Sequence, residues 1–457
     1  MASAAASDRK PDPQIAEDRV LKGGWYTLWV ILGITIFAVV DRQILTLAAA
    51  PLAEGLALSD SQLGMVQGLA FAIFSTLALY PLAWAADRFD RRIVLGLCIL
   101  VWSLGTAACG LAQNFEQLFL AAIAIAAGEA GLGPIAMSIV PDLFKGRKRV
   151  LANALYYAFT LIGMSLGLMV GGLAMGMLDA VHADLPPGLQ SFEAWRLAFF
   201  VVALPAPIFL VLLVFARLRR PAMAVSSATA MTASSPAEFL PFARQHWAAL
   251  LLVFTAVALF MLAAMGFHIW LPVTLTRLFG ATPAENGFGM GLATGCGMVG
   301  GVVAGTALMR HYLPRMGRRA SVRITWVALG IATPLLFAFP FIAAPWQGYG
   351  LMGLLMFACT LLGSILPNML QDMAPAPLRA RVIAIYQIFF GFTGGIAPTL
   401  VGWVSDGIGG DRGLLIAQTL VAVPAWIAGL LLLRFAERPF ERLTDAVAAE
   451  ETESRGP

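Results

Sequence analysis

The chain carries few charged residues for its length. Only 12% of its 457 residues are Asp, Glu, Lys or Arg, whereas 59% are hydrophobic. An average soluble domain has about 25% charged residues, so this chain has too few to cover the surface of a soluble protein of its size. The composition therefore excludes an ordinary cytosolic enzyme, a disordered chain and a nucleic-acid-binding protein.

Cysteine is also scarce, and the motifs of catalysis are missing. The four cysteines, Cys98, Cys109, Cys296 and Cys359, lie within apolar runs and form neither a CxxC pair nor a cluster with His. We expect buried packing residues rather than disulfides or a metal site. The sequence has no GxxxxGK[ST] phosphate loop and no HExxH, Ser/His or Gly-Asp arrangement of an intramembrane enzyme. We therefore expect no enzyme, no metal and no cofactor.

Apolar runs long enough to cross a bilayer are abundant. Each span needs roughly 20 apolar residues. Six such runs start near Trp25, Gln62, Ile93, Leu118, Val150 and Leu197, and six more near Ala248, Gly287, Ile324, Tyr349, Val382 and Gly413. The pattern predicts an all-α membrane protein with 12 transmembrane helices in two pseudo-symmetric six-helix bundles.

Polar segments divide this architecture. The segment between the two sets of spans contains a Ser/Thr/Ala/Pro stretch that is typical of a flexible linker. The polar N-terminal segment lacks the apolar core of a cleavable signal peptide. We predict an N-terminal tail at 1–24, a first bundle at 25–216, a linker at 217–245, a second bundle at 246–436 and a C-terminal tail at 437–457.

The placement of Lys and Arg predicts the orientation of the bundle. If both termini are cytoplasmic, 26 of the 30 basic residues lie in cytoplasmic segments. Arg196, Arg277 and Arg412 lie outside, and Arg42 lies within a span. This split follows the positive-inside rule at every loop. We expect a multi-pass protein of the inner (plasma) membrane with cytoplasmic termini.

Three charged residues lie deep inside apolar runs: Asp41 and Arg42 in the first span, and Glu129 in the fourth. A charge at the bilayer centre costs about 2.5–3.5 kcal/mol on insertion scales. The three residues are at similar depth and would meet if their helices are neighbours. Their charges sum to −1, so one proton makes the cluster neutral. We expect Glu129, together with Asp41, to carry a proton whose affinity Arg42 sets; a static buried ion pair is the alternative.

Other features of the spans allow two interpretations. His268 in the seventh span and Asn368 in the tenth either line a binding cavity with Arg42 and Glu129 or make hydrogen bonds between helices. One face of the fifth span carries four glycines, Gly163, Gly167, Gly171 and Gly172. They predict close contact with another helix. This contact is either static packing or a movable interface between helices.

Several short motifs point to one family. The loop DRFDRR at 87–92 is similar to a G-xxx-D-R-x-G-R-R motif, with Ala83 and Asp90 in place of its two glycines. A basic loop recurs at 310–319, after the eighth span. The remaining matches are the D-R pair at 41–42, Gly-Glu-Ala at 128–130, Pro134, PDLF at 141–144 and Trp-Arg at 195–196. Together they resemble the major facilitator superfamily and, within it, the spinster-like transporters.

This resemblance implies alternating access around a cavity lined by the first, fourth, seventh and tenth helices. It also implies a cytoplasmic latch in which Asp87 faces the start of the eleventh helix and Arg88 or Arg92 pairs with Asp142. These contacts would form in the outward-open state and break in the inward-open state. The spinster branch implies export of lysolipids or sphingoid phosphates, with proton coupling in bacterial members. The expected partners are therefore a lipid-like substrate, protons and membrane lipids, and the expected state is a monomer.

Two other transport functions stay open at this point. Arg42 would also suit a carboxylate clamp in a proton symporter of small organic anions such as sugar acids. A multidrug exporter is the third possibility. A channel or receptor of the same helix number is a hypothesis from a different class, and a channel would differ by carrying steady single-channel currents without saturation.

Overall fold

The computed structural model describes residues 20–216, 218, 236–375, 377–410 and 412–454, and nearly all of them are helical. In these residues, 12 helices are long and apolar enough to cross a membrane. Each begins within a few residues of the start predicted from the sequence, so the predicted fold class is confirmed. Most of the predicted N-terminal tail, 1–19, and most of the predicted linker, 219–235, lie outside the described residues.

The N-terminal half supplies six of these spans, and some of them are interrupted helices. They are α1 (Gly24–Leu47), α3 (Asp60–Gly64) with the π-helical turn η1 (Met65–Leu69) and α4 (Ala70–Arg88), α5 (Arg91–Leu111), α6 (Phe115–Glu129) with α7 (Leu132–Leu143), α8 (Gly146–Val181), and α10 (Ala194–Ala203) with α11 (Ala206–Phe215). Short helical segments link them at α2 (Ala49–Gly55), η2 (His182–Asp184) and α9 (Pro187–Gln190).

The C-terminal half begins with α13 (Pro236–Gln245), which falls inside the predicted linker. Its spans are α14 (Trp247–Phe279), α15 (Pro283–Met316), α16 (Arg319–Ala338) with the turn η3 (Phe339–Phe341), α17 (Pro345–Asp372), α18 (Arg379–Ile408) and α19 (Gly413–Ser454). Helix α19 continues far past residue 436, so most of the predicted C-terminal tail is helical.

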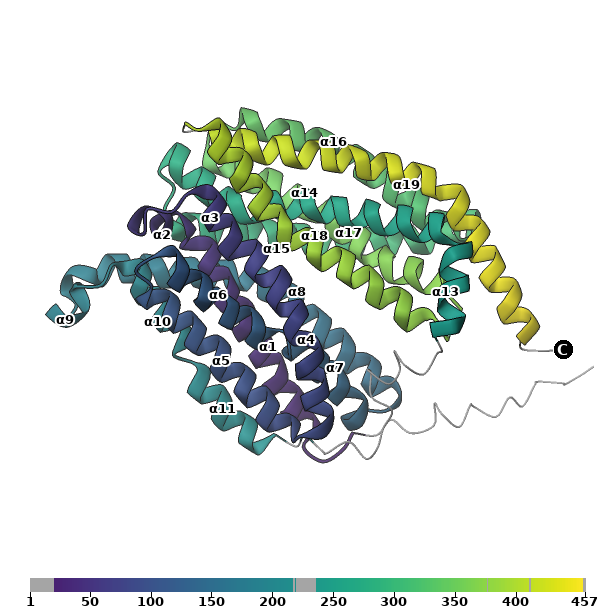
Figure 1. The fold of residues 1–457 in the computed structure, drawn as a ribbon, viewed down its shortest axis with the longest axis horizontal. Coiled ribbons are helices and arrows are strands. Elements are labelled where there is room, and N and C mark those ends of the chain that lie inside the picture. Colours follow the sequence, from purple (N-terminus) through teal and green to yellow (C-terminus); the bar gives the residue numbers. More distant parts are fainter. Residues whose placement is uncertain (1–19, 217, 219–235, 376, 411, 455–457) are drawn as a thin grey trace, which may run out of the picture.

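The halves form two helix bundles set side by side (Figure 1). Helix α13 and the last turns of α19 lie at one end of the molecule, which we call the linker end. Helices α2, α3 and α9 lie at the opposite end, which we call the far end. With twelve crossings, the basic loops at 87–92 and 310–319 both come to the linker end.

Large apolar side chains cover the outside of the bundle as well as its core. Trp102, Trp270 and Trp426 are fully buried, whereas Trp403 and Ile331 are each 74% exposed on the outer surface. A helix that is apolar all round is stable only when its outer face contacts lipid or other protein. The described bundle is therefore built for a hydrocarbon environment.

Candidate functional site

Asp41 is held in the middle of the N-terminal half. Its side chain is 1% exposed, and its Oδ2 lies 2.5 Å from the Thr106 hydroxyl of α5. Asp41 Oδ1 is buried without a hydrogen-bond partner among the described residues. A buried carboxyl oxygen without a partner is costly, so this group is poised for a proton or a polar ligand.

The Thr106 hydroxyl makes a second contact that depends on whether Asp41 is protonated. Its oxygen also lies 3.0 Å from the carbonyl oxygen of Trp102. A hydroxyl has one proton to donate. It therefore donates either to Asp41 or to Trp102, and it satisfies both contacts only when Asp41 is protonated and donates to Thr106. The same arrangement of atoms accommodates Asp41 with and without its proton.

Glu129 reaches the same region because α6 packs unusually close to α5. A Cβ atom on Gly128 would lie 2.7 Å from the backbone nitrogen of Trp102 and 2.8 Å from the carbonyl oxygen of Cys98. Only glycine allows this approach. Helix α6 ends at Glu129 itself, whose Oε1 is buried without a hydrogen-bond partner among the described residues. The carboxylates of Glu129 and Asp41 interact electrostatically.

Arg42 does not form the contact ion pair that we allowed for. Its guanidinium carbon lies 4.4 Å from the centre of the Phe71 ring on α4, and its side chain is exposed. Within the described residues, no carboxylate lies within ion-pair distance of Arg42. Successive residues of a helix point about 100° apart, so Asp41 faces α5 while Arg42 faces α4. Arg42 still interacts electrostatically with Glu129.

His268 brings the C-terminal half into this group. Its ring, on α14, is 3% exposed, and neither ring nitrogen has a hydrogen-bond partner in the described part of the chain. The imidazole and Arg42 interact electrostatically. A histidine kept for structure would use its nitrogens in hydrogen bonds, so these bare nitrogens favour a functional role. We call Asp41, Arg42, Glu129 and His268 the central cluster.

Asn368 is not brought to the central cluster. It is exposed, four residues before the end of α17 at Asp372. At 1.5 Å per residue, it lies roughly 35 Å from the far end of its helix, whereas His268 lies roughly 16 Å from the far end of α14. It therefore lies closer to the linker end than His268.

Sequence reasoning missed Gln67. This residue is 5% exposed, and both polar atoms of its amide lack hydrogen-bond partners among the described residues. It sits in the π-helical turn η1, one turn before Phe71. Single π-helical turns occur frequently at functional sites. The signal available in the sequence is a glutamine within an apolar span. In the structure, Gln67 precedes by one turn Phe71, the residue on which the Arg42 guanidinium stacks.

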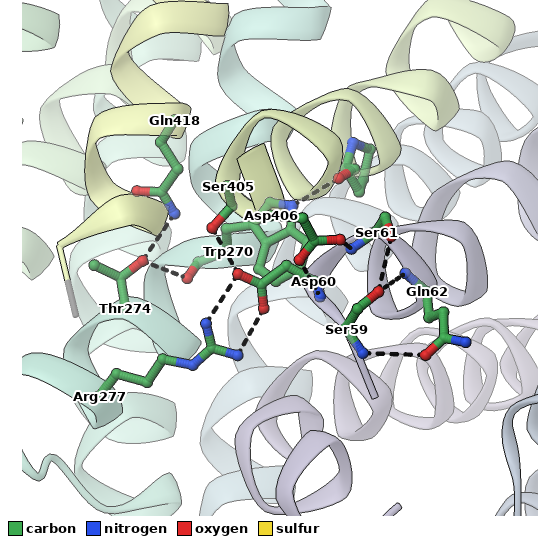
Figure 2. A network of polar contacts seen from close by, with 11 residues as sticks. Ser59, Asp60, Ser61, Gln62, Trp270, Thr274, Arg277, Ser405, Asp406 and Gln418 are labelled. Atoms are coloured by element: carbon green, nitrogen blue, oxygen red, sulfur yellow. Dashed lines mark hydrogen bonds and ion pairs between the residues drawn. The ribbon is translucent and has the colours of Figure 1, made fainter. Parts of the chain in front are cut away.

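A second polar group lies at the far end and joins the two halves. Figure 2 shows Asp60, at the start of α3, facing Arg277 of α14 and Ser405 of α18. The Arg277 guanidinium donates to both Asp60 oxygens, at 2.7 and 3.0 Å. The Ser405 hydroxyl donates to Asp60 Oδ2 at 2.6 Å. This fork-to-fork geometry is the strongest form of an arginine–carboxylate contact.

Asp406 completes this far-end group from the opposite direction. Its two carboxylate oxygens accept hydrogen bonds from the backbone N–H groups of Asp60 and Ser61, at 3.0 and 2.9 Å. These groups are the unpaired donors at the N-terminus of α3, where an anion is favoured. We call Asp60, Ser61, Arg277, Ser405 and Asp406 the far-end clamp. Sequence analysis placed Arg277 outside the membrane but did not foresee its partner.

Close packing of glycine accompanies the clamp. A Cβ on Gly287 of α15 would lie 2.5 Å from the carbonyl oxygen of Leu168 and 2.7 Å from the Cα of Gly172, both on α8. Next to this contact, the hydroxyl of Ser165 donates to the carbonyl of Gly291 at 2.5 Å. The predicted glycine face of the fifth span thus has two roles: Gly172 packs on the other half, while its other glycines pack on α1, namely Gly163, Gly167 and Gly171.

The predicted latch residues lie at the linker end, where Asp142 has another partner in this structure. Asp142 pairs with Arg91 at 2.6 Å rather than with Arg88 or Arg92. Arg91 opens α5 and is buried, so its side chain turns inward onto the end of α7. Arg88 instead stacks on Trp84, at 4.5 Å.

Arg92 of the same loop is held locally. Its backbone N–H donates to Asp90 Oδ1 at 2.9 Å, and its guanidinium donates to the carbonyl of Val214 at 3.2 Å. Asp90 therefore caps α5. The aspartate that replaces the second glycine of the loop motif has a structural reason.

Known proteins resemble this chain over most of its length. The model of the Major Facilitator Superfamily matches residues 31–398. The chain belongs to this superfamily. It is accordingly a secondary transporter and not an enzyme.

Individual relatives differ in what they carry. An MFS-type efflux pump of Mycolicibacterium smegmatis is 25% identical over 439 residues, which are 92% of this chain and 96% of that protein. A hexuronate transporter of Bacillus subtilis is 25% identical over 408 residues, 86% of this chain and 90% of that protein.

Among solved structures, a bacterial homologue of the human lysosomal transporter Spinster has the same fold. It was solved in an inward-facing, unoccupied conformation. It superposes with a TM-score of 0.74 at 22% identity, covering 93% of this chain and 98% of that one. This likeness confirms the predicted fold, and the family model confirms the predicted superfamily.

Proposed function

We propose that this protein is a proton-coupled transporter of amphiphilic, lipid-like molecules that works by alternating access. The observation that carries the proposal is the central cluster, in which two carboxylates and a histidine have polar atoms without hydrogen-bond partners among the described residues, near an exposed arginine. Such groups are costly at mid-membrane depth and are kept there for ion or substrate handling. The cluster draws on both halves, which is where rocking transporters bind their substrates.

The proposed proton carriers are Glu129 and Asp41. When Asp41, Arg42 and Glu129 are all charged, they sum to −1, and one proton neutralises them. Removing a neutral cluster from water costs less free energy than removing a charged one when the halves close over it. The Asp41–Thr106–Trp102 contacts support this role, because they suit Asp41 in both protonation states.

The proposed substrate contacts are Arg42, Glu129 and His268, with Asn368 nearer the linker end. An arginine that is exposed at mid-depth suits an anionic head group. Apart from His268, the sequence places no charged side chain in the middle of a C-terminal span, so the facing wall suits an apolar tail. The spinster resemblance points to the same class of molecule.

We infer that the structure represents an inward-open state in a plasma membrane. The positive-inside rule assigns the linker end to the cytoplasm. The clamp and the glycine contacts hold the two halves together at the far end, which would then face outward. In this account, Asp87, Arg88 and Arg92, with Asp142, help to close the linker end in the opposite state.

Two further substrate classes are favoured by particular relatives. The hexuronate transporter supports symport of a sugar acid, with Arg42 binding the carboxylate. The efflux pump supports export of drugs. Neither alternative changes the proposed proton chemistry.

One experiment separates the three classes. The purified chain is reconstituted in liposomes with an imposed pH gradient, and accumulation is measured for a lysophospholipid, for glucuronate and for ethidium. The proposal predicts gradient-dependent movement of the lysophospholipid. Gradient-driven accumulation of glucuronate or ethidium alone would reject the lipid-like substrate, and steady conductance without saturation would reject a transporter.

A further inference from the structure

The lipid-facing side of the C-terminal half contains a long apolar groove away from the central cluster. It lies between α15, α16 and α17 and has a volume of about 690 Å³. Its walls are aliphatic and aromatic, with Leu308, Val327, Ile331, Leu335, Phe357 and Leu361 among them. Ile331 is 74% exposed, so the groove opens toward the surrounding bilayer.

The groove has the length of one lipid leaflet. Along α16 it runs from Arg323, close to the linker end, to Leu335. The twelve residue steps between them span roughly 18 Å at 1.5 Å per step. Half of the hydrocarbon core of a bilayer is about 15 Å thick. An acyl chain of the leaflet at the linker end would therefore fit the groove from the head-group region to the bilayer centre.

At its linker end, the groove meets a charged hollow. This second cavity, of about 330 Å³, is lined by Arg319, Arg323, Arg434, Glu437, Arg438 and Glu441. Four arginines and two glutamates leave an excess of two positive charges. Arg323 lines both cavities, so the apolar groove and the charged hollow are continuous at this side chain.

The pairing inside the hollow leaves Arg323 loosely held. Arg319 pairs with Glu441, and Arg434 pairs with Glu437 at 2.8 Å. Arg323 lies 4.0 Å from Glu437, which Arg434 already engages, and its side chain is 58% exposed. Its guanidinium can therefore bind an anion without breaking a close ion pair.

We propose that this groove and hollow form a binding site for an anionic phospholipid of the leaflet at the linker end. The phosphate lies against Arg323 and Arg438, and one acyl chain fills the groove. Basic hollows between membrane helices bind acidic head groups in this way. The site is distinct from the central cluster, and the proposal does not depend on which substrate is transported.

The charge of the hollow argues for lipid over a second copy of the chain. Most homodimers are two-fold symmetric, so the same patch of each copy meets itself. Such a contact would bring two surplus-positive hollows together. A zwitterionic lipid lacks the net charge that the surplus arginines favour, and a free phosphate would leave the groove unfilled.

The test is native mass spectrometry of the full-length protein equilibrated with phosphatidylglycerol or phosphatidylcholine of the same chain length. We expect the wild-type protein to retain phosphatidylglycerol preferentially. Arg323→Gln should reduce this retention about fivefold, the effect of one surface arginine on an acidic lipid. Arg442→Gln is the matched control on α19 outside the hollow and should leave retention unchanged. Equal retention of both lipids, or no effect of Arg323→Gln, would overturn the proposal.

Two further measurements distinguish binding of the lipid head group from binding of the acyl chain. Ala328→Trp, which fills the groove, should reduce retention of phosphatidylglycerol, whereas glycerol phosphate should not displace it. Displacement by glycerol phosphate, or full retention in Ala328→Trp, would show that no acyl chain occupies the groove. Dimer cross-linking through Ile331→Cys would overturn the proposal in favour of a second copy. If Arg323→Gln fails to fold, Arg438→Gln provides the same test of the head group.

Discussion

The central cluster and the far-end clamp are both built from aspartate and arginine, yet their hydrogen bonding is opposite. In the clamp, Asp60 accepts from Arg277 and Ser405, and Asp406 accepts two backbone N–H groups. In the central cluster, Asp41, Glu129 and His268 each keep at least one buried polar atom without a partner among the described residues.

This difference in hydrogen bonding indicates that the clamp and the central cluster have different functions. A fully paired polar network stabilises one arrangement of the chain. Because the clamp joins the two halves, it stabilises the state in which the far end is closed. Unpaired buried groups are instead an energetic cost that a proton or a ligand can relieve. We therefore propose that the clamp sets the conformational balance and that the central cluster carries the coupling.

The largest effect is expected from removing the proposed proton carrier, Glu129. Glu129→Gln keeps the size and polarity of the side chain but cannot release a proton, so accumulation driven by a pH gradient should be lost completely. Thermal unfolding should stay close to that of the wild-type protein. Glu116→Gln, an exposed acid in the first turn of the same helix, is the control and should transport normally. Sustained accumulation by Glu129→Gln would show that the proton is carried elsewhere.

Breaking the clamp should shift the conformational balance without removing coupling. Glutamine can keep at most one of the two hydrogen bonds from Arg277 to Asp60, so Arg277→Gln loses at least one bond to a charged group, worth about 1.5–3 kcal/mol. The ratio of far-end-closed to far-end-open molecules should therefore fall by on the order of 10- to 100-fold. Distances between spin labels placed on the far ends of the two halves report this ratio. The far-end residue Arg412 lies outside the clamp, and Arg412→Gln should leave the distances unchanged; equal distances in all three proteins would refute the role of the clamp.

Adding a methyl group between the two halves should also lower the ratio of far-end-closed to far-end-open molecules, here through steric overlap. The Cβ of Gly287→Ala would press on the backbone of α8, and overpacking of this kind costs about 1–3 kcal/mol. The same spin-label distances should move toward the far-end-open state. Gly363→Ala, where a Cβ meets nothing within 4 Å, is the control. A Gly287→Ala protein that closes as well as the wild type would show that this packing does not limit closure.

The smallest effect concerns the hydroxyl beside Asp41. Thr106→Val keeps the shape of the side chain but removes its hydrogen bond. The infrared carbonyl band of protonated Asp41, identified by its loss in Asp41→Asn, should therefore shift in Thr106→Val and stay near its wild-type position in Thr106→Ser. Absence of any Asp41 band at the pH values where transport occurs would show that Asp41 does not carry a proton.

The sequence predicts the fold well because membrane spans are set by local composition. A run of about 20 apolar residues needs no knowledge of its neighbours, and all twelve spans begin close to their predicted starts. Counting residues along each helix predicts similar depths for Asp41 and Glu129. Helix α13 and the long continuation of α19 were not foreseen, because their polar sequences do not carry a span signal.

The polar contacts between helices were harder to predict. Asp60 and Arg277 are 217 residues apart, and they meet only because α3 packs on α18 while the side chain of Arg277 reaches across from α14. The choice of Arg91 over its neighbours as the partner of Asp142 depends on the direction in which each side chain leaves α5. Gln67 was overlooked because a single glutamine in an apolar run has no local pattern to distinguish it.

The most direct test of this account compares net proton-driven movement with exchange in the same liposomes. Wild-type protein and Glu129→Gln are assayed for substrate-dependent proton flux with an internal pH dye, and for exchange of labelled substrate at equal pH on both sides. The account predicts that Glu129→Gln loses proton flux but retains substrate exchange. The two halves still alternate between inward-open and outward-open states, whereas glutamine at position 129 neither binds nor releases a proton. Proton flux that persists in Glu129→Gln would contradict the assignment of coupling to the central cluster.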